Sequence, residues 1–561
     1  MSENSCLSNF QDKSGDAVLS ISNDGAFVSS GFFKYLKHKD SSSSFEENPF
    51  LYSFSPILNE MVLYGHRGEF HIKPTEGEVN VERPLWCAHD IFFFYNKNQW
   101  LISDDMTAMT AMQAKLKSNP GFIANYLSST EFATDQTPFT GIGCVMPGTT
   151  AILHSNGQIT YTLICGETSQ LDSNEIPETL IEHINSAGGP NRPFILELSG
   201  GLDSSGVFYA ALTQPRTAEQ LYPVTYYDPN ISNSTDVVAA QALCGKHGVN
   251  LHLIPIRSDG IFTDLFTGPA YKPKRPSLWL LHSSSQRDLI DYAQSLPTDC
   301  MILNGHGGDH IFLSNPVASA IIDHLWKKHP NITKAFETAR KLTVLNQKSW
   351  LRLARESLSD CQARLYFHIY GAANIGSSQD KKAIFNSELY RIAFNEQKRV
   401  NSIFQNQSVS SDWIRHRRSL MAAVHHGAAD RLTDIRYQTV YPYLNETLIR
   451  WAENRSDSST FSYELNRLPQ RESFHRRFGA TSFMRKGKGD ISGIVQRMIR
   501  AESEHIVELI LNGEAAKCGF INKANVLDDI RRCQLGGEFI SPSTLLLLSL
   551  ELYYKCWKSE M

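Results

Sequence analysis

The sequence lacks the features that mark several large classes of protein. Its ten cysteines form no CxxC pair, so neither a zinc site nor a dithiol redox motif is indicated. No apolar run reaches the roughly 20 residues of a membrane span, and the first residues resemble no signal peptide. The net charge of −4 gives no indication of nucleic-acid binding. These absences favour a cytoplasmic protein with reduced cysteines.

The composition is that of an ordinary globular protein, and 561 residues are enough for several domains. Residues 1–165 contain short strand-like runs with frequent turns and few helical patterns, which predicts a β-rich domain. Residues 166–192 are polar and are predicted to be a linker with a short helix near 177–186. The expected strands of the first domain lie at 17–21, 61–64, 91–95, 100–103 and 150–154, and its helices at 106–116 and 122–127.

Residues 193–561 are predicted to form a second domain, in which strands and helices first alternate. This alternation predicts an α/β fold with a parallel sheet and helices on both faces. After residue 310 the pattern is mostly helical, and the last helix is expected to begin at Ser541 or Ser543 as its cap. The expected strands lie at 193–198, 222–227, 250–256 and 299–304, and the helices between them at 204–213, 235–247 and 283–295.

The segment Phe194–Ser205 is the most informative stretch of the chain. An apolar strand stops at Ser199-Gly200-Gly201, and a helix-compatible stretch follows. Such a turn points backbone N–H groups at one spot beside a helix N-terminus, which suits a phosphate chain. No Lys follows the glycines, so this is not the GxxxxGK[ST] loop. Asp203 stands there instead, and its carboxylate can hold Mg²⁺ that binds phosphate.

A second glycine-rich loop, Asn304–Phe312, follows the strand expected at 299–304. Because ligand groups gather at the carboxyl ends of parallel strands, this loop should share an edge with the first. It supplies Asp309, and two Asp from neighbouring strand ends are what Mg²⁺ bridging ATP phosphates would use. The alternative is that Asp309 caps a helix beginning at His310.

The motif Ser-Gly-Gly-Leu-Asp-Ser-Ser205 resembles the pyrophosphate loop of ATP pyrophosphatases. Enzymes of that group cleave ATP between the α and β phosphates, adenylate a substrate oxygen and release pyrophosphate. They include asparagine synthetase, NAD synthetase, GMP synthetase and argininosuccinate synthetase. The resemblance therefore implies ATP and Mg²⁺ as cofactors.

The second loop is similar to that of lasso peptide macrolactam synthetases, in which Gly-His-Gly-Gly-Asp-His recurs. Asparagine synthetases carry Ser-Gly-Glu-Gly-Ser-Asp-Glu there. The segments Thr137–Gly148 and Asp434–Asn445 also resemble segments of asparagine synthetases. The resemblance implies an N-terminal glutaminase-like domain of the Ntn type, then a synthetase domain with C-terminal helices.

The N-terminus departs from the asparagine synthetase pattern. Glutamine-dependent members have a nucleophilic Cys at position 2, whereas this chain has Ser2, and its nearest thiol is Cys6. The segment that would contact glutamine is at best His66–Glu69. We expect a degenerate domain that makes no ammonia, so that the amine arrives with the substrate.

The resemblance also implies roles for individual residues. Lys488 is expected to be the catalytic cation and Lys486 to match the Arg of an Arg-x-Lys pattern, with Arg485 as the alternative if the register slips. Taken alone, this is an ordinary basic loop. The metal ligands would be Asp203 and Asp309. The ATP and pyrophosphate site would comprise Leu198, Ser199, Gly200, Gly201, Asp203, Ser204, Ser205, Val224, Tyr226, Asn304 and Gly305.

A base should take the proton of the attacking ammonium, and His306 is the first candidate because His titrates near neutrality. His310 is the second candidate, and for both the alternative is a loop histidine with local hydrogen bonds. His425 and His426 are more simply explained by packing. Asp228 and Asp236 are candidates for shaping the loop after the second strand.

The sequence as a whole predicts an ATP-dependent lasso peptide cyclase. It would adenylate an Asp or Glu side chain of a precursor peptide, which the N-terminal amine then attacks to close a macrolactam. The expected partners are that precursor peptide and the leader peptidase of the same pathway. The alternatives are an asparagine synthetase or a β-lactam synthetase-like small-molecule amide synthetase, and a catalytically inactive binding protein.

Overall fold

The computed structural model describes most of the chain from residue 68 onward and only isolated strands before it. The predicted sites at Ser2, Cys6 and His66–Arg67 lie outside the described residues. The described residues are 18–22, 25–29, 34–35, 51–53, 61–65, 68–75, 78–96, 99–103, 106–111, 113, 115–128, 133–166, 171–188, 192–213, 218–231, 234–257, 272–296, 300–314, 316, 318–326, 329–370, 383–405, 411–428, 439–485, 492–536 and 539–561.

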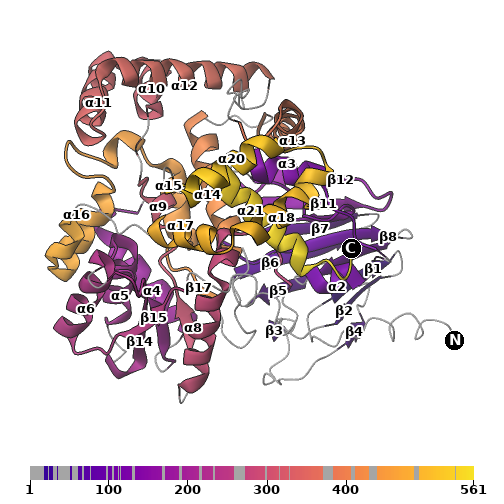
Figure 1. The fold of residues 1–561 in the computed structure, drawn as a ribbon, viewed down its shortest axis with the longest axis horizontal. Helices are drawn as coiled ribbons and strands as arrows, with labels where there is room; N and C mark the ends of the chain where they lie inside the picture. The colour runs from indigo at the N-terminus through magenta and orange to yellow at the C-terminus, as the bar shows by residue number, and fades with distance from the viewer. Residues whose placement is uncertain are drawn as a thin grey trace.

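The N-terminal region contains two six-stranded antiparallel sheets, which lie at the right of Figure 1. The first has the order β10-β8-β9-β1-β2-β4 and the second the order β12-β11-β7-β6-β5-β3. The predicted β-rich character of this region is therefore confirmed. The strands are β1 (Val18–Ser22), β2 (Gly25–Ser29), β3 (Lys34–Tyr35), β4 (Leu51–Ser53), β5 (Met61–Gly65), β6 (Gly68–Thr75), β7 (Glu78–Arg83), β8 (Phe92–Asn96), β9 (Gln99–Ser103), β10 (Ile142–Cys144), β11 (Thr149–His154) and β12 (Ile159–Leu163).

The second region contains the predicted parallel sheet, with the strand order β15-β14-β13-β16-β17. All four of its strand pairs are parallel, and β13 is buried along its whole length, as expected for a central strand covered on both faces. The fifth strand was not predicted. The strands are β13 (Phe194–Glu197), β14 (Leu221–Tyr227), β15 (His252–Pro255), β16 (Met301–Leu303) and β17 (Thr439–Val440).

Helices surround this sheet and fill the space between it and the N-terminal sheets (Figure 1). The described helices are α2 (Met106–Ala111), α3 (Pro120–Ser128), α4 (Ile176–Gly188), α5 (Leu202–Ala211), α6 (Thr235–His247), α8 (Ser283–Ser295), α9 (Gly308–Ile311), α10 (Ser319–Leu325), α11 (Ile332–Leu345), α12 (Trp350–Tyr370), α13 (Ser387–Gln405), α14 (Ser411–Ala428), α15 (Glu446–Asn454), α16 (Leu468–Phe478), α17 (Ser492–Ala501), α18 (Ser503–Leu511), α19 (Glu514–Lys517), α20 (Lys523–Gln534) and α21 (Pro542–Cys556). None of these helices combines the length and the apolar character that a membrane span requires.

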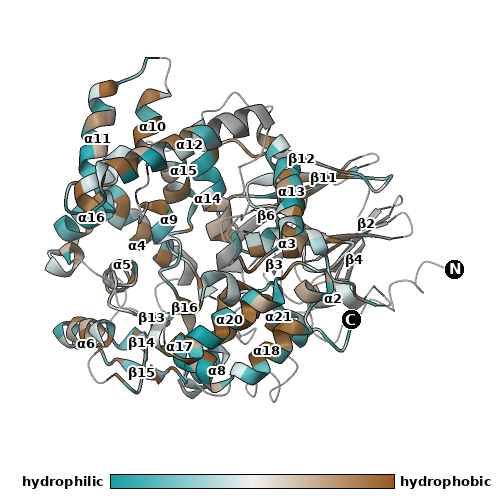
Figure 2. Ribbon diagram, turned by 45° about the horizontal axis from the view of Figure 1, so that its top comes forward, coloured by the Kyte–Doolittle hydropathy of each residue, from teal (hydrophilic) through white to brown (hydrophobic). Residues whose placement is uncertain are grey.

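Two apolar cores join the N-terminal and C-terminal parts of the chain. In one of them, Phe122 of α3 and Phe139 are buried together with Tyr553 of α21 and Trp557. Figure 2 shows α18, α20 and α21 together, with hydrophobic residues along these helices, and α21 also contacts α3. The other core contains α4, whose Leu180 and Ile184 are buried with β13 and α5. The part of the predicted linker that forms α4 therefore packs against the parallel sheet.

Candidate functional site

The first predicted phosphate loop has the strand–turn–helix geometry expected from its sequence. Gly200 has a φ of +69° and lies so close to α6 that a Cβ there would be 2.7 Å from that of Ala239. Only glycine adopts this positive φ without strain and also leaves room for the close approach of α6. Gly201 is the N-cap of α5, and the Ser204 hydroxyl accepts a hydrogen bond from the backbone N–H of Ser199 at 3.2 Å. The start of α5 therefore adds its positive end to this turn.

The second loop packs directly against the first, as the shared sheet edge predicts. A Cβ at Gly305 would lie 3.0 Å from the backbone nitrogen of Ser204, and one at Gly308 would overlap the carboxylate of Asp203. Gly307, with a φ of +98°, is the N-cap of α9. The alternative role for Asp309 is therefore wrong, because α9 begins at Gly308 and Asp309 lies inside its first turn.

The carboxylates of Asp203 and Asp309 converge on one guanidinium group. Arg467 forms an ion pair with Asp203, with an Nη1–Oδ2 distance of 2.6 Å, and a second ion pair with Asp309. Gln470 donates a hydrogen bond to Oδ1 of Asp203 at 2.9 Å. Arg467 precedes α16 and has a φ of +53°, a conformation that is unfavourable for a residue with a side chain. Sequence reasoning missed Arg467, because nothing local marks it as a partner of a loop more than 150 residues away.

The electrostatics of this cluster reflect an excess of negative charge. Burial raises the pKa of Asp203, Arg467 opposes that shift, and the neighbouring Asp309 adds to it. Burial alone would lower the pKa of Arg467, but the two carboxylates outweigh it and raise that pKa. The side chain of Asp309 is 45% exposed and that of Asp203 21% exposed, so the pair can be reached by a ligand.

The two aspartates fit Mg²⁺ as ligands, since hard carboxylate oxygens from two strand ends already face a single cationic group. Among the residues that the structure describes, no three His, Cys, Asp or Glu side chains gather into a complete metal cage. Mg²⁺ commonly takes one or two carboxylates, water and substrate phosphates instead. The pair therefore suits a cation that arrives with ATP.

The two loop histidines contact the same face of α14. The Nε2 of His306 lies 2.8 Å from the carbonyl oxygen of Ala423, and the Nδ1 of His310 lies 3.1 Å from the hydroxyl of Ser419. A carbonyl only accepts, so Nε2 of His306 carries a proton and Nδ1 is the basic nitrogen of its neutral form. His425 is buried on the same helix, close enough to Asp90 to affect its pKa. The side chain of His426 lies outside the described residues.

The predicted nucleotide-binding backbone groups are partly engaged with one another. The N–H of Leu198 donates to the carbonyl of Val224 at 2.8 Å, and the Thr225 hydroxyl donates to the carbonyl of Leu198. The side chain of Tyr226 points to Glu197, a buried carboxylate on β13 that also contacts Asn304. Sequence reasoning missed Glu197, although a single acidic residue in an otherwise apolar strand was a visible signal.

The predicted basic loop, Phe483–Asp490, is described only as far as Arg485, so Lys486 and Lys488 lie outside the described residues. Both flanks of this segment are held near the site. Arg471 donates to the carbonyls of Phe483 at 2.7 Å and Arg485 at 2.9 Å, and it lies one helical turn from Arg467.

On the other flank, Arg497 of α17 forms an ion pair with Asp228 at the carboxyl end of β14. Asp228 also accepts a hydrogen bond from the backbone N–H of Asn230 at 2.9 Å, as expected for a residue that shapes this loop. Asp236 lies in the first turn of α6, whose backbone contacts Gly200.

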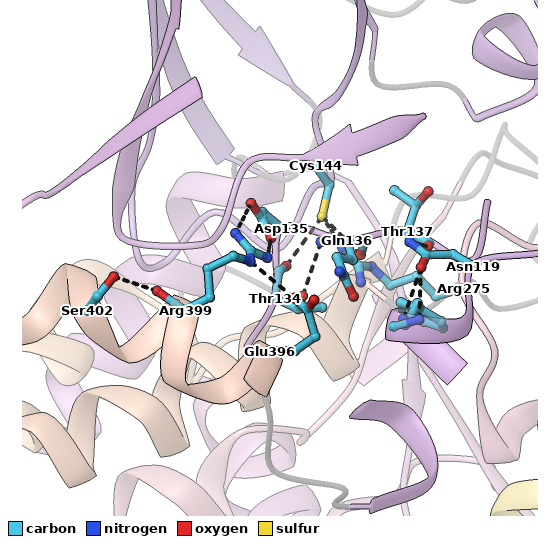
Figure 3. A network of polar contacts seen from close by, with 12 residues as sticks. Asn119, Thr134, Asp135, Gln136, Thr137, Cys144, Arg275, Glu396, Arg399 and Ser402 are labelled. Atoms are coloured by element: carbon cyan, nitrogen blue, oxygen red, sulfur yellow. Dashed lines mark hydrogen bonds and ion pairs between the residues drawn. The ribbon is translucent and has the colours of Figure 1, made fainter. Parts of the chain in front are cut away.

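Residues 134–144, which overlap the segment Thr137–Gly148, make polar contacts with the C-terminal part of the chain (Figure 3). Arg399 of α13 donates to the carboxylate of Asp135, with an Nη1–Oδ2 distance of 3.0 Å. Arg275 donates to the sulfur of Cys144 at 3.1 Å. The same guanidinium binds the buried carboxylate of Asp90 at 2.6 Å, and so joins the two regions.

A family model described as asparagine synthase matches residues 185–555. The Microcin J25-processing protein McjC of Escherichia coli is 23% identical over 388 residues, which cover 69% of this chain and 65% of that protein. The match therefore spans less than two thirds of that relative.

Among solved structures, the glutamine-dependent NAD+ synthetase from Acinetobacter baumannii in complex with adenosine diphosphate is 15% identical. The alignment covers 53% of this chain and 63% of that one, with a TM-score of 0.18. An overlap this slight carries no argument about the fold.

Proposed function

Because the chain belongs to the asparagine synthase family, which makes it an ATP-dependent amide-forming ligase, we propose that it is a lasso peptide cyclase. The observation that carries this proposal is the second loop, in which Gly305–His310 reads Gly-His-Gly-Gly-Asp-His and packs on the phosphate loop. The match to a microcin-processing protein supports a peptide as the substrate. The product would be an isopeptide macrolactam formed with release of AMP and pyrophosphate.

In the first half-reaction, an Asp or Glu carboxylate of the peptide attacks the α phosphorus of ATP. The bond from that phosphorus to the bridging oxygen breaks, and pyrophosphate leaves. Ser199, Gly201 and Ser205 would donate to the departing phosphates at the start of α5. Asp203 and Asp309 would hold Mg²⁺, which neutralises phosphate charge when it is bound.

In the second half-reaction, the N-terminal amine of the peptide attacks the activated acyl carbon. The bond from that carbon to the AMP oxygen breaks, and the amine gives up a proton. His306 would accept this proton at Nδ1, since its Nε2 faces the carbonyl of Ala423. Lys488 would stabilise the negative charge that develops on oxygen.

The N-terminal region would then be a glutaminase-like domain that no longer produces ammonia. Ser2 replaces the nucleophilic Cys of glutamine-dependent relatives, so no thiol stands at that position to attack glutamine. The region would be retained for its structural contacts, because its Phe122 and Phe139 share a core with Tyr553 and Trp557.

The test is the dependence of AMP and pyrophosphate release on the acyl donor. We expect release with a leader-processed precursor peptide, together with loss of one water mass from the peptide, and none with glutamine. Release with free aspartate and ammonia would instead establish a small-molecule amide synthetase. Lys488→Met should lower turnover by about 10²-fold or more, whereas the matched change Lys517→Met, at an exposed lysine that pairs with Glu514, should leave it unchanged.

A further inference from the structure

A buried carboxylate lies directly beneath the proposed site, and none of the roles above uses it. Glu197 is the last residue of β13 and is 7% exposed, between the fully buried Leu196 and Leu198. An apolar side chain would suit this central strand, and burying a carboxylate there costs free energy unless hydrogen bonds compensate. The position therefore calls for an explanation beyond packing.

The carboxylate of Glu197 accepts hydrogen bonds from two neighbouring strands. The hydroxyl of Tyr226, on β14, donates to Oε1 at 2.9 Å. The amide nitrogen of Asn304, which follows β16, donates to Oε2 at 2.6 Å. Glu197 thus connects the three central strands at the edge where both glycine loops begin.

Asn304 carries this connection into the second loop. Its side-chain oxygen accepts a hydrogen bond from the backbone N–H of His306 at 2.7 Å, and its own backbone N–H donates to Val440 of β17 at 3.0 Å. The ring of His306 in turn contacts the carbonyl of Ala423. A continuous series of hydrogen bonds therefore runs from Tyr226 through Glu197 and Asn304 to His306.

We propose that Glu197 is a positioning residue that sets the orientation of the Asn304 amide and, through it, the place of His306. An amide has one donor end and one acceptor end, whereas an ionised carboxylate only accepts. Glu197 therefore keeps the nitrogen of Asn304 toward itself and the oxygen toward the N–H of His306. The consequence for amide formation rests on the proposed function, but the effect on loop position does not.

The decisive comparison is between Glu197→Leu and Glu197→Gln. Leucine fits an apolar strand but offers no acceptor, so the Asn304 amide loses its orientation. Glutamine can accept from Asn304 with its oxygen and donate to the Tyr226 hydroxyl, which can reverse its role. If Glu197 served only stability, the leucine variant would be less stable than the parent but, once folded, equally active.

We expect Glu197→Leu to lower kcat for macrolactam formation by about 10²-fold, because a displacement near 1 Å at a reacting group has that effect. The KM for ATP should change little, whereas the thermal midpoint should fall modestly, because the Tyr226 hydroxyl and the Asn304 amide lose their acceptor. Glu197→Gln should stay within about tenfold of the parent, since it keeps the acceptor. Tyr126→Phe, which removes a distant buried hydrogen bond to Ser549, is the matched control and should leave kcat unchanged.

A second measurement, of the position of His306, does not depend on enzyme activity. In protein labelled with ¹⁵N-histidine, the amide resonance of His306, identified by its loss in His306→Gln, should move in the leucine variant and stay in the glutamine and Tyr126→Phe variants. An unmoved resonance in Glu197→Leu, or equal displacement by leucine and glutamine, would overturn the positioning role. A parent enzyme that shows the expected resonances but no peptide-dependent turnover would reject the proposed function alone.

Discussion

Two charged clusters of this protein have opposite composition. At the sheet edge, one guanidinium, Arg467, lies between two carboxylates, Asp203 and Asp309. Between the N-terminal sheets and the synthetase region, one carboxylate, Asp90, lies between two guanidinium groups, Arg83 at 2.9 Å and Arg275 at 2.6 Å. The first cluster carries an excess negative charge and the second an excess positive charge.

The clusters also differ in their access to solvent. Asp309 is 45% exposed, whereas the side chains of Asp90 and Arg83 are fully buried. A partly exposed cluster with more carboxylates than cations can attract a cation from solution. A cluster that is shielded from solvent can only stabilise the segments that form it. Burial would raise the pKa of Asp90, yet Arg275 and Arg83 lower it well below its usual range, while the pKa of Asp203 is raised. Under the proposed function, the side chains at the sheet edge serve binding, whereas the similar side chains of the buried cluster serve structure.

The largest expected effect is on catalysis at the edge cluster. Asp203→Asn removes one proposed metal ligand but leaves Arg467 paired with Asp309, so turnover should fall by at least about 10²–10³-fold with little loss of stability. Pyrophosphate release and the thermal midpoint measure the two effects separately. Asp323→Asn, at a distant ion pair with Arg415, is the matched control. A fully active Asp203→Asn enzyme would show that the cluster at the sheet edge, like the buried cluster, has no role in catalysis.

The buried cluster should respond in the opposite way. Asp90→Asn leaves Arg83 and Arg275 facing each other without a charge partner, which should destabilise the fold by about 3–5 kcal/mol. The molecules that remain folded should keep their turnover, because Asp90 has no part in the proposed chemistry. Urea unfolding followed by activity at low temperature measures both. Loss of activity without loss of stability would make this cluster part of the site.

The stability difference between the parent and Asp90→Asn should depend on pH. The folded-state pKa of Asp90 lies below its unfolded value, so its stabilising effect is present above that unfolded value, about 3.9, and is lost as pH falls toward the folded one. The difference in unfolding free energy between parent and Asp90→Asn should therefore stay constant near neutrality and shrink below about pH 4. A difference that instead grew in acid would reverse the assigned sign.

The contrast between the clusters shows what sequence could and could not predict. The bounds of α6 and α8 match the prediction, because the start and end of a helix are set locally, as by the cap Ser234 and the left-handed Gly248 of α6. The glycine loops were recognised for the same reason. Arg467, Glu197 as an acceptor, and the two-residue strand β17 depend on contacts between distant segments, which a local pattern does not contain.

A moderate effect is expected from Arg467→Met, which leaves Asp203 and Asp309 as unpaired neighbours. In the presence of a chelator the variant should lose about 1–3 kcal/mol of stability, because two like charges then face each other. Added Mg²⁺ should restore more stability to the variant than to the parent, since the guanidinium no longer competes for the carboxylates. Thermal unfolding with and without Mg²⁺ measures this. Equal responses of variant and parent would argue that the pair is not a cation site.

The smallest effect is expected where one member of a charge pair between the two regions is exposed. Asp135 pairs with Arg399, whose side chain is 45% exposed, so solvent competes for the guanidinium. Asp135→Asn should therefore cost about 1 kcal/mol or less, and salt should reduce that cost further. Urea unfolding at low and high salt measures the difference from Asp90→Asn directly. The burial of the ion pairs between the two regions, rather than their number, would then determine how much they stabilise the fold. A loss of stability in Asp135→Asn as large as that in Asp90→Asn would contradict this expectation.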